Sequence, residues 1–336
     1  MARLIHTVLY VFFGLFFAVD SSAQIEVYTD SGKVVLSHLS TDMANFGRRD
    51  PIANCDYDEI IIPLKRAGRL LLIEGEVDGE KGNFIFDTGA PYLVLNATYF
   101  REYDLRNELY ASGITGGQTA IMVTKVGKLK INKLWYGDVR ADVAELGHIE
   151  DARGVQILGL MGLNLFKSFI MEIDLSKGYL KLIKCDKKGE PYLSDVSEYD
   201  LVHDLSFYDN TIFVKCKVAG RNLRFGIDSG AEINAISSMS NRKVLETVRI
   251  TGRSKLMGTG SESVEILYGS MKELYLGEVG LFNMQTVITQ LEDMGEAYGV
   301  AIDGMLGYEF FSRGKIRINI PKKELKLRLF DNFRQE

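Results

Sequence analysis

Two stretches of this chain are versions of one another. Residues 83–90 read Asn-Phe-Ile-Phe-Asp-Thr-Gly-Ala, and residues 224–231 read Arg-Phe-Gly-Ile-Asp-Ser-Gly-Ala. Each is an apolar run that leads into an aspartate, a hydroxyl residue, glycine and alanine, and the two copies align without a gap at a shift of 141 positions, from Asp87 to Asp228. Such a repeat indicates an internal duplication. We expect a chain that presents the same carboxylate turn twice to bring its two aspartates together.

Each turn is followed by a second matched element. Residues 157–162 (Ile-Leu-Gly-Leu-Met-Gly) and 301–307 (Ala-Ile-Asp-Gly-Met-Leu-Gly) are mainly apolar and end in glycine, at a shift of 145 positions from Gly162 to Gly307. Pairs of β-rich runs come next, at residues 169–174 and 179–182 in the first half and at residues 315–319 and 324–327 in the second. Both halves therefore carry the same ordered set of signals.

Short β-rich runs punctuated by glycine dominate both halves, which is the spacing of hairpins in an all-β fold. Asp78-Gly79 is a strong signal for a two-residue hairpin turn, and Ala219-Gly220 occupies the matching place in the second half. Helical pattern is confined to short pieces at residues 97–103 and 239–247 and directly after Gly162 and Gly307. The sequence predicts an all-β protein with two lobes.

The predicted organisation has five parts. They are a signal peptide over residues 1–23, an N-terminal arm or pro-segment over 24–57, a first lobe over 58–184, a linker over 185–199 and a second lobe over 200–336. The apolar run at residues 8–19 has signal-peptide dimensions and is shorter than the roughly 20 residues that span a bilayer. We therefore expect export to the periplasm or the extracellular space, with no membrane span after the signal is removed.

Composition narrows the functional classes. The net charge of −5, without runs of lysine or arginine, is unfavourable for a nucleic-acid binder. Three cysteines (Cys55, Cys185 and Cys216) permit at most one internal disulfide, so disulfides are not expected to hold the fold together. The four histidines (His6, His38, His148 and His203) show no metal-ligand spacing. We expect no metal and no cofactor.

The repeated turn has a chemical logic. An apolar strand delivers the carboxylate to a packed surface, and the glycine lets the backbone turn tightly and approach closely. Two carboxylates a few ångströms apart do not both ionise at low cost, so Asp87 and Asp228 are expected to share a proton. One would act as general base on a water while the other, protonated, acts as general acid on a carbonyl oxygen. This arrangement predicts direct hydrolysis of an amide without a covalent intermediate.

With these motifs the chain resembles the retropepsin-like and pepsin-like aspartic peptidases of clan AA, in a two-lobed tandem form. The resemblance covers residues 58–183 and 200–330. It implies two retropepsin-like lobes around a central cleft, a peptide or protein substrate, and a monomer with internal pseudo-two-fold symmetry. The site residues that it implies are Asp87 and Asp228 as the catalytic pair, with Thr88, Gly89, Ser229 and Gly230 as their support.

The same family closes a hairpin flap over its substrate. By position the flaps would be residues 113–118 and 257–261, with Gly116, Gly117, Gly258, Thr259 and Gly260 at the substrate. Neither stretch has a tyrosine at its tip, as the pepsin flap does, so the side chain that would contact the transition state from above stays open.

Ala90 and Ala231 stand where many pepsin-like enzymes have a hydroxyl residue that donates to the catalytic carboxylate. Losing that donor raises the pKa values of the pair. The hypothesis that follows is an activity optimum nearer to neutral pH than that of pepsin.

Three functions remain compatible with these patterns. The first is an exported aspartic endopeptidase that hydrolyses peptide bonds with Asp87 and Asp228 around a shared water. The second is a catalytically silent peptide-binding or scaffolding protein that uses the same cleft. The third is a maturation protease held inactive by residues 24–57.

Overall fold

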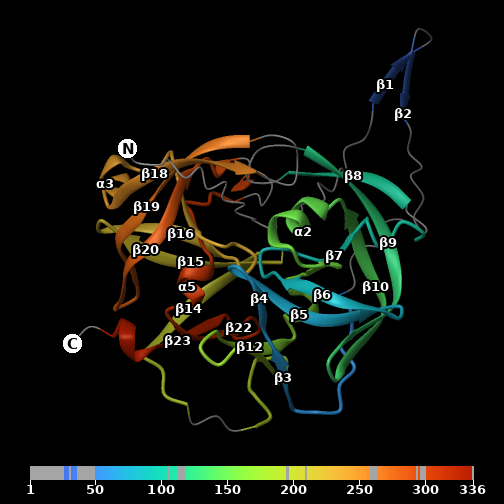
Figure 1. Cartoon of the computed structure of the whole chain (residues 1–336), viewed down its shortest axis with the longest axis horizontal. Coiled ribbons are helices and arrows are strands. Elements are labelled where there is room, and N and C mark those ends of the chain that lie inside the picture. Colours follow the sequence, from blue (N-terminus) through green and yellow to red (C-terminus); the bar gives the residue numbers. More distant parts are fainter. Residues whose placement is uncertain are drawn as a thin grey trace.

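The computed structural model describes residues 26–29, 32–35, 50–103, 106–112, 118–193, 197–208, 210–257, 263–292, 294–295 and 300–334. Over these residues the chain is built almost entirely from strands, and the helices are short. Figure 1 shows the first half (blue to green) beside the second half (yellow to red), with strands from both halves meeting between them. The prediction of two tandem all-β lobes is confirmed.

Six strands close the first barrel. In barrel order they are β5 (Leu70–Val77), β6 (Glu80–Phe86), β11 (Gly159–Met161), β7 (Leu93–Asn96), β10 (Leu134–Ala144) and β9 (Gln118–Ile131). β9 pairs back onto β5 through Val77 and Leu129, which closes the ring of strands. Two further strands, β4 (Lys65–Ala67) and β8 (Arg106–Ser112), extend the sheet beyond the ring.

The second barrel repeats the first strand by strand. Its order is β15 (Thr211–Val218), β16 (Arg221–Ile227), β21 (Gly304–Leu306), β17 (Asn234–Ser237), β20 (Val279–Thr289) and β19 (Ser263–Leu276). The pairing of Lys217 with Tyr275 closes it. β5, β6 and β7 recur at a shift of 141 positions, and β9, β10 and β11 recur at 145. The four additional residues of the second half therefore lie between β17 and β19, around α3 (Arg242–Leu245) and β18 (Val248–Met257).

A third, antiparallel sheet joins the two halves. Its order is β3 (Glu59–Pro63), β13 (Tyr179–Lys184), β12 (Phe169–Asp174), β22 (Gly314–Asn319), β23 (Glu324–Leu329) and β14 (Leu201–Tyr208). Each half contributes three strands, and β12 meets β22 at the centre. The strand pairs that follow the two glycine elements therefore do not belong to the barrels. They join the lobes.

Glu172 and Arg317 face each other across the β12–β22 pair, and they are also 145 positions apart, so the pseudo-two-fold axis passes between them. Both side chains are buried, and Arg317 Nη2 donates to Glu172 Oε2 at 2.6 Å. Burial by itself raises the pKa of Glu172, but Arg317, Lys315 and Tyr179 together bring that pKa below its ordinary value. A dimer of identical halves would place like residues at this axis, whereas one duplicated chain can place an ion pair there.

The two predicted hairpin turns are confirmed. Asp78 and Gly79 have φ values of 48° and 100°, and Ala219 and Gly220 have φ values of 49° and 74°. Positive φ at both central residues is the conformation of a two-residue turn whose twist matches that of the flanking strands.

The helix predictions were partly wrong. Residues 97–103 form turns and no helix, whereas the structure has an unpredicted two-turn helix, α2 (Gly147–Arg153). α2 ends at Gly154, which adopts the left-handed conformation with φ of 63°. It buries Ile149 against the outer apolar side of the first barrel, so this contact stabilises a helix too short to form in isolation.

The part of the N-terminal arm nearest to the first lobe docks onto that lobe. Asn54 exchanges two backbone hydrogen bonds with Trp135, and Lys184 Nζ donates to the carbonyl oxygen of Cys55. Farther upstream, β1 (Glu26–Thr29) and β2 (Gly32–Val35) pair as a small hairpin (Figure 1). The predicted signal peptide lies outside the described residues, and the assignment of residues 24–57 as an arm or pro-segment stays a prediction.

Cys55, Cys185 and Cys216 are all free thiols. Among the helices that the structure describes, none has the length and apolar composition needed to cross a bilayer.

Candidate active site

The two aspartate turns are tied together by hydroxyl groups. The backbone N–H of Thr88 donates to Ser229 Oγ, and the N–H of Ser229 donates to Thr88 Oγ1, each at 2.9 Å. Each hydroxyl then donates to the other lobe, Thr88 Oγ1 to the carbonyl of Ile227 at 3.0 Å and Ser229 Oγ to the carbonyl of Phe86 at 2.8 Å. All four bonds are buried, so they hold the two turns in one register without competition from water.

Glycine at the third position of each turn makes room for the opposite aspartate. A Cβ atom built on Gly89 would lie 2.5 Å from Asp228 Cγ, and one built on Gly230 would lie 2.5 Å from Asp87 Cγ. Neither position accepts a side chain without displacing a carboxylate. The structure therefore brings together all six residues that the sequence singled out: Asp87, Thr88, Gly89, Asp228, Ser229 and Gly230.

Backbone amides orient the two carboxylates. Asp87 Oδ1 accepts from the N–H groups of Gly89 at 2.8 Å and Ala90 at 3.0 Å, and Asp228 Oδ1 accepts from the N–H of Gly230 at 2.8 Å. The Oδ2 atom of each aspartate is buried and receives no hydrogen bond from a donor group among the described residues, whereas the two carboxyl groups lie close enough to hydrogen-bond to each other when one is protonated. Each carboxylate thus has one oxygen held by backbone amides and one enclosed oxygen that no backbone amide of the turns holds.

Burial and proximity both disfavour two negative charges here. Both aspartates are 0% exposed. Burial and the charge of Asp228 raise the pKa of Asp87 well above its ordinary value, and burial raises the pKa of Asp228. The pair is therefore expected to hold one proton over a wide pH range and to lose its two protons in separate steps.

The two glycine elements support the turns from the adjacent strands. The N–H of Asp87 donates to the carbonyl of Met161 at 3.1 Å, and the N–H of Asp228 donates to that of Leu306 at 3.0 Å. Gly162 allows this packing, because a Cβ atom there would lie 2.1 Å from the carbonyl oxygen of Tyr92. The element identified from its repeat thus sets the position of the turn.

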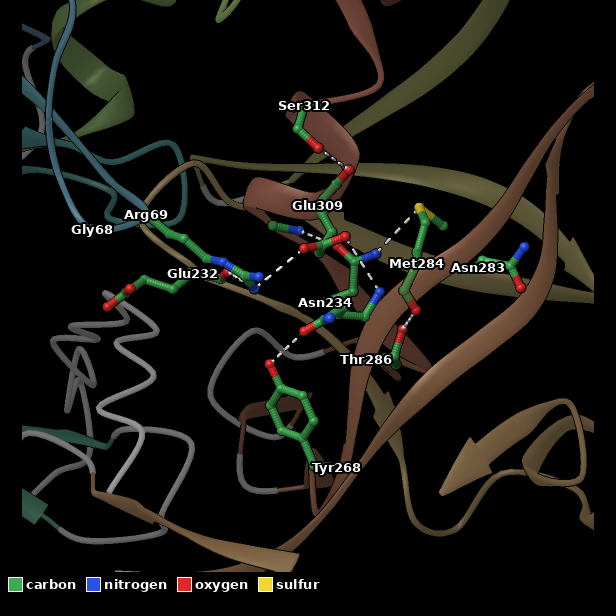
Figure 2. Close-up of polar contacts among 12 residues, drawn as sticks. Gly68, Arg69, Glu232, Asn234, Tyr268, Asn283, Met284, Thr286, Glu309 and Ser312 are labelled. Atoms are coloured by element: carbon green, nitrogen blue, oxygen red, sulfur yellow. Dashed lines mark hydrogen bonds and ion pairs between the residues drawn. The ribbon is translucent and has the colours of Figure 1, made fainter. Parts of the chain in front are cut away.

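A network of charged residues that the sequence analysis did not predict joins the first lobe to the segment that follows the second aspartate turn (Figure 2). Arg69 of the first lobe pairs with Glu309 Oε1 of the second at 3.2 Å and donates to the carbonyl oxygen of Glu232 at 3.4 Å. Arg153, at the end of α2, pairs with the Glu232 carboxylate. Glu232 lies four residues after Asp228, while Pro91 holds the equivalent place in the first half, so no repeated pattern points to this network.

The structure does not test the placement of the predicted flap residues. Gly116, Gly117, Gly258, Thr259 and Gly260 lie outside the described residues. The strands on either side of them form antiparallel hairpins, β8 with β9 and β18 with β19, whose last described pairs are Ser112 with Gln118 and Met257 with Ser263. The flap assignment stays a prediction.

Within the part of the chain that the structure describes, no group of histidine, cysteine and acidic side chains could hold a metal ion. The chemistry that the site offers is that of two coupled carboxyl groups.

Comparison with known protein families matches residues 73–165 and residues 214–310 to the family described as aspartyl protease. Each matched segment contains one aspartate turn and one glycine element, and together the segments cover more than half of the chain. The chain therefore belongs to the aspartyl protease family. The comparison with curated proteins found no match.

Replacing Thr88 by valine tests how much the hydrogen bonds between the two turns contribute to stability. The substitution keeps the size of the side chain but leaves the N–H of Ser229 and the carbonyl of Ile227 buried without a partner. An unpaired buried polar group costs about 1–3 kcal/mol, so we expect the free energy of unfolding to fall by roughly 2–4 kcal/mol in denaturant titrations. Thr88→Ser, which retains the hydroxyl, is the control. Equal loss in the two variants would contradict this assignment.

The raised pKa values of Asp87 and Asp228 have a consequence for stability. The folded state holds its protons to higher pH than the unfolded state does, so this contribution to stability is complete below about pH 4 and is lost as the pH rises through the folded-state pKa values. We expect the Asp87→Asn, Asp228→Asn double variant to gain stability relative to the wild type between pH 4 and pH 7.5. A stability difference that does not change with pH would refute the raised pKa values.

Proposed function

We propose that this protein is an exported aspartic endopeptidase. The observation that supports this function best is the pair of facing carboxyl groups of Asp87 and Asp228. Backbone amides hold their Oδ1 atoms, and their Oδ2 atoms receive no hydrogen bond from a donor group among the described residues. A water molecule that bridges the two Oδ2 atoms would satisfy both and would be positioned for attack on a bound peptide. The export part of the proposal depends on the signal-peptide pattern at residues 1–23.

The reaction follows from the shared proton. The ionised aspartate removes a proton from the water as the water oxygen bonds to the peptide carbonyl carbon, while the protonated aspartate donates its proton to the carbonyl oxygen. The product of this step is a neutral tetrahedral diol. Collapse of the diol breaks the carbon–nitrogen bond. One hydroxyl proton passes to the ionised aspartate, and the proton held by the other aspartate passes to the nitrogen of the leaving amine. The two carboxyl groups end with one proton between them, as they began.

Two features of the turns fix the positions of the two carboxyl groups: the hydrogen bonds that Thr88 and Ser229 exchange, and the close approach of each glycine to the opposite aspartate. Catalytic groups contribute their full effect only when they are held within a few tenths of an ångström of the productive geometry. Here each aspartate sits one residue before a hydroxyl that is bonded into the opposite lobe. The backbone of the turns is thus positioned before substrate binds.

Incubation with a diverse peptide library, alongside Asp87→Asn and Asp228→Asn variants, tests the proposal. We expect the wild-type protein to release product and each substitution to lower the rate at least about 100-fold, the smaller end of the range for a general acid or base. Asp138→Asn, at an exposed aspartate paired with Lys125, is the matched control and should keep full activity.

Two other outcomes would assign the site differently. Binding of peptides without product, in the wild type as well as in the variants, would favour the peptide-binding or scaffolding function. Activity that appears only after removal of residues 1–57 would favour a protease held inactive by its N-terminal arm, in keeping with the complete burial of both aspartates.

The alanine that follows each turn lacks a hydroxyl donor, and this predicts the pH at which activity is highest. Asp87 Oδ1 accepts hydrogen bonds from the backbone N–H groups of Gly89 and Ala90, and the alanine side chain adds no hydroxyl donor. In an Ala90→Ser variant the added hydroxyl would stabilise the ionised pair, so we expect the optimum of kcat/KM to move toward acid by up to about one pH unit. Ala90→Cys, which is close to serine in bulk but is a weak hydrogen-bond donor, serves as the control. An optimum unchanged by serine would count against the neutral-shift hypothesis.

A further inference from the structure

Asp142 is a buried carboxyl group that takes no part in the reaction proposed for Asp87 and Asp228. It lies on β10 and is 1% exposed. Its Oδ1 atom is 3.5 Å from Arg140 Nη2, and its Oδ2 atom is enclosed and has no hydrogen-bond partner among the residues that the structure describes. Burial raises its pKa to about 6. A buried acceptor without a donor destabilises the fold, and a donor supplied by a ligand would remove that cost.

Asp142 lies on a strand that pairs with β7, the strand that follows the first aspartate turn. In the parallel pairing of β10 with β7, Asp142 lies opposite Val94. The strand β7 begins six residues after Asp87. On its other side Asp142 is paired with Val123 on β9, one of the strands of the hairpin predicted to be a flap. Arg140 extends the contact toward the turn, since its guanidinium lies 4.9 Å from the ring centroid of Tyr92.

The second lobe has no such carboxylate. The shift of 145 positions maps Asp142 onto Val287, which packs in an apolar cluster of the second barrel, and maps Val123 onto Tyr268. Tyr268, labelled in Figure 2, donates to the side chain of Gln285 at 2.8 Å, and Gln285 is the counterpart of Arg140. The two lobes therefore differ at matched positions: the first has an open acceptor, and the second has an apolar side chain and a paired polar group.

The charge of the neighbouring Arg140 determines which kind of group would bind to Asp142 Oδ2. Arg140 lies beside Asp142 and balances its negative charge, so the site lacks a hydrogen-bond donor rather than a cation. A second positive charge would also be repelled by Arg140. A neutral amide or hydroxyl side chain satisfies the acceptor without adding charge.

We propose that Asp142 is a specificity-determining residue that accepts a hydrogen bond from a neutral amide or hydroxyl side chain of the substrate. The corresponding position on the other side of the scissile bond, next to Val287, accepts an apolar side chain. This inference rests on the proposed endopeptidase function. Asp142 Oδ2 is enclosed as fully as the Oδ2 atoms of the dyad, so the opening that admits a peptide to the dyad is also needed here.

Matched peptides test the proposal, because asparagine and leucine have nearly the same shape and differ in hydrogen-bonding capacity. Asparagine replaces leucine at one position at a time, over four residues on each side of the cleaved bond, and kcat/KM is measured for the wild type and for Asp142→Val, which copies the second lobe. We expect the wild type to favour asparagine at one position, and the asparagine-to-leucine ratio there to fall about 10–100-fold in Asp142→Val, the value of one hydrogen bond to a charged group.

An unchanged ratio in Asp142→Val would overturn the proposal, as would a preference for lysine over asparagine at the same position in the wild type. If Asp142→Val does not fold, Asp142→Leu, which is closer to aspartate in shape, replaces it under the same criteria. If the wild type cleaves none of the peptides, the endopeptidase function fails separately, and the same series is then measured by calorimetric binding. A ratio of affinities that depends on Asp142 would support the subsite without the protease, and equal ratios would overturn it.

Discussion

The exchange of hydrogen bonds between Thr88 and Ser229 is the interaction on which the site depends. It joins one turn from each lobe with four buried bonds, and it does so one residue away from each aspartate. Placing two carboxyl groups side by side without exposure to water is unfavourable for their charged forms. The rigid turns maintain this arrangement, and the resulting proton sharing is the property that acid–base hydrolysis uses.

Duplication within one chain has allowed the two halves to diverge at equivalent positions. Glu172 and Arg317 are symmetry mates that form an ion pair across the axis. Asp142 and Val287 place a carboxylate in one barrel and an apolar side chain in the other. A symmetric dimer of identical subunits cannot make such distinctions. The structure is therefore symmetric at the two aspartates and asymmetric around them. Under the proposed function, this asymmetry would let the protein distinguish the two directions of a bound peptide.

Local, repeated signals made most of the fold predictable. The turns at Asp78 and Ala219 and the two aspartate turns are short segments whose conformation depends on their own residues, so their patterns were sufficient. α2 was missed because it is stabilised by packing of Ile149 against the barrel and not by its own composition. The network of Arg69, Glu232 and Glu309 was missed for a related reason, since its members are far apart in the chain and occur once.

From the order of residues alone follow the duplication, the two carboxylate turns, the β-rich character of both halves and the identity of the candidate catalytic pair. These properties are encoded in contiguous segments, where residue type controls backbone conformation. The joining of the halves through β12 and β22, the burial of the dyad and the unpartnered oxygen of Asp142 depend on which surfaces meet after folding. Contacts between distant segments are set by the packing of the whole chain, so they became visible only in three dimensions.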